Sequence, residues 1–200
     1  TMKKIEIRTV NVTQYLQPLR EGGSLPAIVK ANDGFLYVLK FRGAGQGKKA
    51  LISEFIGGEL ARAMGLKVPE LVFIHNIDRT AKNTNLLNWN DELWVIDNGA
   101  SFYFHHNWQT WESHLTRTFP LIKDHVLLAK ATVLEEASSA VKELINKDVI
   151  AEIIAKIPED WLLSEGDFLN PTEMRTAYNT FLNAKLAMID ELVKEAENAR

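Results

Sequence analysis

Four polar side chains near the middle of the chain have the types and spacing needed for phosphoryl chemistry. Asp78, Lys82 and Asn83 share one polar loop, and Asp97 ends an apolar segment further along. A carboxylate can accept the proton of a substrate hydroxyl, and the amide oxygen of an asparagine can bind Mg²⁺. A lysine between them can neutralise a phosphoryl group in transfer. These residues therefore predict a metal-assisted phosphoryl transfer.

A lysine and a glutamate nearer the N-terminus extend this set. Lys40 ends an apolar segment, and Glu54 follows within a helical pattern. A lysine at a strand end can pair with phosphate oxygens, and a glutamate on a helix can fix its position. Asp97 ends a predicted strand, so we expect its carboxylate to point into a cleft, where a hard cation would bind oxygen ligands. Asn98 and Gly99 follow it, which is the form of the magnesium-binding D-F-G element with Asn98 in place of Phe. The order of these residues along the chain predicts a kinase-like site.

The elements that position these residues form a β-rich N-terminal part and a helical C-terminal part. Alternation with period two and apolar spacing with period 3.6 separate the strands from the helices. Asp33-Gly34 and Asn90-Asp91 predict hairpin turns, Gly65 ends a helix, and Asn170 can cap one. The predicted strands are residues 4–10, 26–30, 35–41, 86–89 and 93–96, with a strand or extended segment at 68–74. The predicted helices are residues 51–64, 126–145 and 149–157, a short turn at 158–163, and one long helix from 170.

The composition is that of an ordinary globular protein. The 200 residues are 46% hydrophobic and 24% charged, with a net charge of -3 and no cysteine. Disulfides, thiolate nucleophiles and cysteine-bound metals are thereby excluded, and direct nucleic-acid binding is not expected. No apolar run is long enough for a membrane span, and no leader is evident. We therefore expect a cytoplasmic protein without a membrane partner.

Two stretches resemble the HipA-like kinases of the protein-kinase-like superfamily. They are residues 76–87, which contain the Asp78 loop, and residues 94–99, which read W-V-I-D-N-G. Phosphatidylinositol kinases have a similar D-R-x-x-x-N and I-D-x-G arrangement. Residues 15–26 and 37–65 also look like the front of a HipA-like kinase domain. The resemblance covers roughly residues 12–126 and fades in the C-terminal helices.

The resemblance implies an α+β, two-lobed, protein-kinase-like fold. A small β-rich N-lobe with one helix would comprise residues 1–75, and a mainly helical C-lobe residues 76–200. It further implies transfer of the ATP γ-phosphoryl group, with Mg²⁺, to a Ser or Thr hydroxyl of a protein substrate. An antitoxin-like protein is a further candidate partner. A small-molecule or lipid kinase and an inactive module that binds nucleotide or a partner are the alternatives.

The same resemblance implies a role for each candidate residue. Lys40 would be the ATP-phosphate lysine, held by Glu54, and Asp78 the catalytic base. Lys82 would assist catalysis, while Asn83 and Asp97 would be the metal ligands. The loop of Gly22, Gly23 and Ser24 would cover the phosphates, although G-G-S departs from the G-x-G-x-x-G of ordinary protein kinases.

The spacing between Lys40 and Asp78 departs from the kinase pattern. The predicted helix and one extended segment take up nearly all of the chain between Lys40 and Asp78, and His75 follows Ile74 without further residues between them. A kinase-like fold needs further strands, an adenine-contacting hinge and C-lobe helices there, which would take about 50 to 70 residues. Either the protein lacks this segment, which favours an inactive module, or the printed sequence omits it. We favour the omission.

Two adjacent histidines, His105 and His106, follow the D-N-G element. Side chains of neighbouring residues point apart, and no pair of histidines has the i, i+4 spacing of a helical metal site. We therefore expect substrate-side or packing roles for them.

Overall fold

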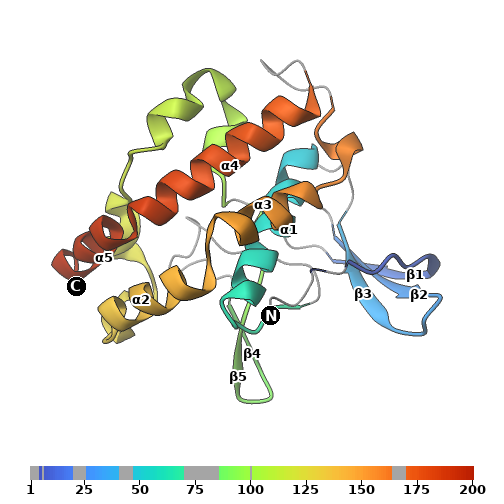
Figure 1. Ribbon diagram of the computed structural model, residues 1–200. Coiled ribbons are helices and arrows are strands. Elements are labelled where there is room, and N and C mark those ends of the chain that lie inside the picture. Colours follow the sequence, from blue (N-terminus) through green and yellow to red (C-terminus); the bar gives the residue numbers. More distant parts are fainter. Residues whose placement is uncertain are drawn as a thin grey trace.

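A computed structural model describes residues 5, 7–19, 26–40, 47–69, 86–99, 101–163 and 170–200. A small antiparallel sheet stands at one side of the molecule, a β-hairpin extends from the base, and helices make up the rest (Figure 1). The predicted α+β class is therefore confirmed. Among the described residues, no helix is both long and apolar enough to cross a bilayer.

The sheet contains β1 (Val12–Pro18), β2 (Ala27–Ala31) and β3 (Leu36–Leu39), in that order. Its β2–β3 hairpin is the one predicted, and Gly34 makes the turn with a φ of +89°. The strand predicted at 4–10 is wrong where it can be checked, because residues 5 and 7–10 lie outside any strand. Ile5 and Ile7 pack against the helical core instead, which explains their alternation without a ladder.

Helix α1 (Gly47–Ala63) follows the sheet and begins earlier than predicted. Every residue from Ala50 to Ala61 is buried, so the helix is enclosed on all sides. Gly65 ends it as predicted, with a φ of +75°, and the Leu66 amide donates to the Ala61 carbonyl at 2.9 Å.

The second predicted hairpin is also confirmed. It joins β4 (Leu86–Trp89) to β5 (Glu92–Val95), and Asn90 and Asp91 turn with φ of 51° and 61°. Positive φ at both central residues is characteristic of the type I′ turn, whose backbone twist matches that of paired strands. The Val95 amide donates to the Lys67 carbonyl at 3.1 Å, which attaches the hairpin to the chain after α1.

Short 3₁₀ helices follow the hairpin. They are η1 (Tyr103–His106), η2 (Trp108–His114), η3 (Pro120–Asp124) and η4 (Leu128–Lys130). Helix α2 (Leu134–Leu144) comes next, so the single helix predicted at 126–145 is wrong in its first half. The β-branched pair Thr132-Val133 disfavours helix at the point where the prediction fails.

The back of the molecule is helical, as predicted. Its elements are α3 (Lys147–Ala155), η5 (Glu159–Trp161), α4 (Pro171–Ala187) and α5 (Ile189–Asn198). Asn170 caps α4 by accepting from the Glu173 amide at 3.0 Å. The long last helix is broken at Met188, and α5 is held against α2 by an ion pair of Asp190 with Lys142.

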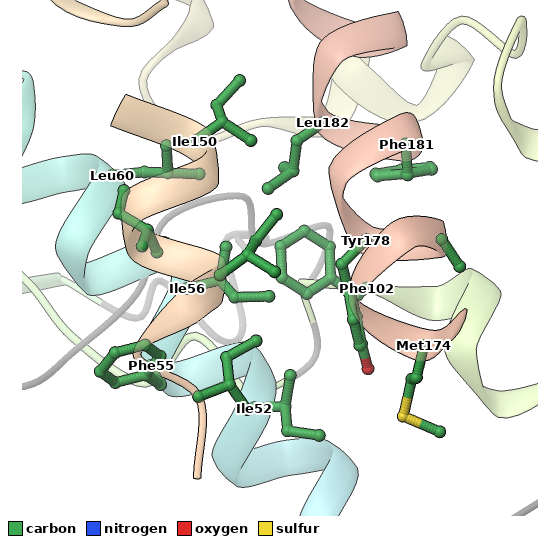
Figure 2. Close-up of a cluster of buried hydrophobic side chains, with 14 of the residues drawn as sticks. Ile52, Phe55, Ile56, Leu60, Phe102, Ile150, Met174, Tyr178, Phe181 and Leu182 are labelled. Atoms are coloured by element: carbon green, nitrogen blue, oxygen red, sulfur yellow. The ribbon is translucent and has the colours of Figure 1, made fainter. Parts of the chain in front are cut away.

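One hydrophobic core joins α1 to the C-terminal helices. In Figure 2, side chains of α1, α3 and α4 point toward one another around Phe102. The most buried members include Ile52, Ile56, Ile150, Phe102 and Tyr178. Burial of each large side chain of this kind stabilises the fold by about 1.5–3 kcal/mol. Helix α1 is therefore fixed by its contacts with the C-terminal half of the chain.

Candidate active site

Lys40 brings three of the predicted site residues together. It follows β3 directly, and its Nζ donates to Glu54 Oε1 of α1 and to Asp97 Oδ1, just past β5, at 2.9 Å. The side chain of Glu54 is 10% exposed, that of Lys40 24% and that of Asp97 54%. Exposure to solvent therefore increases across the cluster, from the buried carboxylate of Glu54 to the half-exposed carboxylate of Asp97.

Glu54 is held by both of its oxygens. While Oε1 accepts from Lys40, Oε2 accepts from the backbone amide of Asn98 at 3.1 Å. A buried carboxylate needs such donors, because leaving either oxygen unpaired would be costly. Glu54 thus ties the end of β3 to the end of β5.

The turn after β5 leaves Asp97 half-exposed and buries Asn98. Asp97 has a φ of 49°, in the left-handed region that aspartate tolerates better than most residues. Asn98 is fully buried, and its carbonyl accepts from the Ser101 hydroxyl at 2.7 Å. This turn leaves the Asp97 carboxylate half-exposed at the strand end.

The charges of the cluster shift one another's pKa values. Burial would lower the pKa of Lys40, but the carboxylates of Glu54 and Asp97 outweigh burial and raise it. Burial raises the pKa of Glu54, and Lys40 offsets this only in part. Burial would raise the pKa of Asp97 too, but the hydrogen bond from Lys40 prevails and lowers it. Lys40 and Asp97 are therefore both charged at neutral pH.

The cluster fits part of what ATP and Mg²⁺ require. Asp97 offers a half-exposed carboxylate, which suits a hard cation, and Lys40 offers an ammonium, which suits phosphate oxygens. Both oxygens of Glu54 are already engaged, so it is a positioning residue rather than a metal ligand. Within the described ranges, no three His, Asp or Glu side chains form a metal site by themselves. A cation at Asp97 would thus need ligands from elsewhere.

The other predicted site residues lie outside the described residues. They are Gly22, Gly23 and Ser24 of the phosphate-covering loop, and Asp78, Lys82 and Asn83 of the catalytic loop. Their roles stay predictions, as does the junction of Ile74 with His75.

Sequence reasoning missed two features of this region. One is the Asn98 amide as a partner of Glu54, which no side-chain pattern signals. The other is the environment of His105, which is fully buried beside Tyr178, while His106 is exposed. The two side chains do not point apart as expected, because their ring centroids lie 4.7 Å from each other in an edge-on contact. For His105, the expected packing role is the one that fits.

Comparison with known families gives one match. A family model described as HipA-like kinase matches residues 12–74, which is less than half of the chain. The resemblance is thereby confirmed over this segment. The HipA-like segment contains the whole sheet, α1, Lys40 and Glu54, and it supports a kinase-like function at the level of the family. Comparison with curated proteins gave no match, nor did comparison with solved structures.

The HipA-like match ends at residue 74. The spacing of the motifs predicts a deletion or an omission at the same point, between Ile74 and His75, and this stays a prediction.

Proposed function

We propose that this chain is a Mg²⁺-dependent kinase that transfers the ATP γ-phosphoryl group to a Ser or Thr hydroxyl of a protein. The observation that carries the proposal is the position of the Lys40 ammonium between Glu54 and Asp97. In kinases a strand lysine must be paired with a helix glutamate, and a metal-binding aspartate must stand nearby, before transfer is fast. The HipA-like match over the segment that carries Lys40 and Glu54 adds support.

Each candidate site residue has a part in this proposed mechanism. Lys40, positioned by Glu54, would pair with phosphate oxygens, and the loop of Gly22, Gly23 and Ser24 would cover them. Asp97 and Asn83 would hold Mg²⁺, which neutralises charge on the phosphates when bound. Asp78 would accept the proton of the acceptor hydroxyl. The hydroxyl oxygen would then bond to the γ-phosphorus while the bond between that phosphorus and the ADP oxygen breaks. Lys82 would stabilise the charge in transfer.

An inactive module that binds nucleotide or a partner protein is the second candidate. The short chain between Lys40 and Asp78 favours it, because a site without the hinge segment would lack part of what positions ATP for transfer. A kinase for small molecules or lipid head groups is the third candidate, since those enzymes share the I-D-x-G form. A protein substrate, an antitoxin-like partner and a cytoplasmic location all belong to the first proposal.

Phosphoryl transfer from labelled ATP to a cell lysate tests the proposal. Asp97→Asn should lower the rate by roughly 100-fold or more, because it removes a charge that acts on the transferring group. Asp91→Asn is the matched control, since Asp91 is also an aspartate with positive φ in the same hairpin region and should behave like the wild type. Equal background rates in all three proteins would overturn the kinase proposal. Label in small molecules or lipids alone would support the third candidate instead.

A further inference from the structure

Three polar side chains form a chain of contacts inside the hydrophobic core. His105 Nδ1 lies 3.0 Å from the Tyr178 hydroxyl, and His105 Nε2 lies 3.5 Å from the Ser53 hydroxyl. All three residues are 0% exposed, and they come from η1, α4 and α1. Figure 2 shows Tyr178 among apolar side chains of α1, α3 and α4, beside Phe102. The contacts thus connect three elements at the centre of the fold.

Apart from these two hydroxyls and the edge of the His106 ring, at 4.7 Å between centroids, the surroundings of His105 are aromatic. Phe102, Phe104, Trp108 and Tyr178 have ring centroids 5.9–6.3 Å from its ring. An apolar side chain would suit these neighbours, whereas a polar one must find hydrogen-bond partners or destabilise the core. The directional contacts of His105 therefore fix how η1, α1 and α4 meet, which packing alone would define less sharply.

The residue that His105 contacts on α1 is next to Glu54. Successive residues on an α-helix point about 100° apart, so Ser53 can face the core while Glu54 faces Lys40. The segment after β5 is attached to α1 twice, by the Asn98 amide to Glu54 and by His105 to Ser53. Rotation of α1 that withdrew Glu54 from Lys40 would break both attachments.

We propose that His105 and Tyr178 are positioning residues that hold α1 in the orientation in which Glu54 meets Lys40. The inference rests on the proposed function, because it concerns the Lys40–Glu54 pair of the proposed kinase site. Both residues are fully buried, so neither is placed to touch a substrate. Their effect passes through Ser53 and the orientation of α1.

The rate at which an amine-reactive ester acylates Lys40 reports how well Glu54 shields the ammonium. The labelling is done without nucleotide and is measured by mass spectrometry. Because Glu54 shields the Lys40 ammonium, withdrawal of Glu54 should speed its labelling. We expect His105→Gln and Tyr178→Phe each to raise the rate about fivefold, the factor expected for one lost buried hydrogen bond. Lys142, whose ion pair with Asp190 joins α2 to α5, is the internal reference and should not change.

Two further proteins separate positioning from general loosening of the fold. Tyr103→Phe alters an exposed tyrosine of the same 3₁₀ helix and should label like the wild type. In a Glu54→Gln background, the carboxylate that shields Lys40 is already absent. His105→Gln should therefore not raise the rate of Lys40 labelling any further. Unchanged Lys40 labelling in both His105→Gln and Tyr178→Phe, or a rise shared with Lys142, would overturn the inference. Absent phosphoryl transfer in the wild type would refute the proposed function but leave the labelling result standing.

Discussion

The ammonium of Lys40 lies 2.9 Å from the carboxylate of Asp97, although 57 positions separate the two residues in the sequence. Three elements have to converge for this contact: β3 presents the lysine, β5 presents the aspartate, and α1 places Glu54 behind them. Because α1 is packed in the same core as α3 and α4, the contact depends on the C-terminal helices as well as on the HipA-like segment.

The pairing predicts that Lys40→Met destabilises the protein as well as inactivating it. The substitution leaves the buried carboxylate of Glu54 without its ammonium, and we expect the free energy of unfolding to fall by about 2 kcal/mol. This is less than for a fully buried pair, since Lys40 is partly exposed. Urea unfolding measures the loss.

A second substitution supplies the control for Lys40→Met. Adding Glu54→Gln removes the unpaired charge and should restore most of the lost stability without restoring phosphoryl transfer. Lys30→Met, at an exposed lysine of the same sheet, should change the free energy of unfolding by less than about 0.5 kcal/mol. A double variant as unstable as Lys40→Met would contradict the proposed charge pairing.

Glu54→Gln alone should separate activity from stability. Burial raises the pKa of Glu54, so its ionised form is disfavoured in the fold, and glutamine avoids that penalty while it loses the pairing with Lys40. We expect the free energy of unfolding to change by less than about 1 kcal/mol, while phosphoryl transfer falls roughly 10- to 100-fold.

The matched control for Glu54→Gln is Glu59→Gln. Glu59 is the other buried glutamate of α1, and it pairs with Arg62 instead of Lys40. Steady-state transfer rates for the two variants should differ by at least tenfold, with Glu59→Gln close to the wild type. Equal rates would mean that the carboxylate at 54 has no part in the reaction.

His105 should make stability depend on pH below neutrality. Burial, reinforced by the charges of His106 and Lys49, holds the pKa of His105 well below its usual 6.5. The unfolded chain therefore binds the proton first as the pH falls. Stability is full above pH 6.5 and should decrease below it by up to about 1.4 kcal/mol per pH unit, until the pH reaches the folded pKa.

Urea unfolding between pH 7 and pH 5 measures this dependence. His105→Gln cannot take up the proton, so its unfolding free energy should fall less steeply with pH than that of the wild type. His106→Gln is the matched control at an exposed neighbouring histidine, and its slope should stay closer to the wild-type slope. Identical slopes in the wild type and His105→Gln would exclude this histidine as the titrating group.

Local sequence signals predicted the parts of the fold that local chemistry decides. The two hairpins follow from Asp33-Gly34 and Asn90-Asp91, in which Gly34, Asn90 and Asp91 have positive φ. The end of α1 follows from Gly65, and the start of α4 follows from Asn170. The pairing of Lys40 with Glu54 and the position of Asp97 at a strand end could be predicted because the motif fixes their order. The motif could not specify the Asn98 amide, since every residue has one.

The predictions failed where tertiary contacts override a local pattern. Ile5 and Ile7 alternate like a strand but pack on the core, and the apolar spacing before α2 hides a run of 3₁₀ turns. The burial of His105 is a similar case. Its position after the D-N-G element suggested either a substrate-side or a packing role, and only the meeting of η1 with α4 decides between them.

The junction of Ile74 with His75 allows the most direct test of the chain itself. Trypsin cleaves after Lys67 and Arg79, so a protein with the printed sequence yields the peptide of residues 68–79 across the junction. If about 50 to 70 residues of the kinase fold are omitted there, this peptide is absent from a digest of the protein purified from its natural source. We expect it to be absent, and the intact mass to exceed 22.6 kDa. Detection of the 68–79 peptide would show that Ile74 and His75 are joined, and would favour the inactive module, because the site would then lack the segment that contacts adenine.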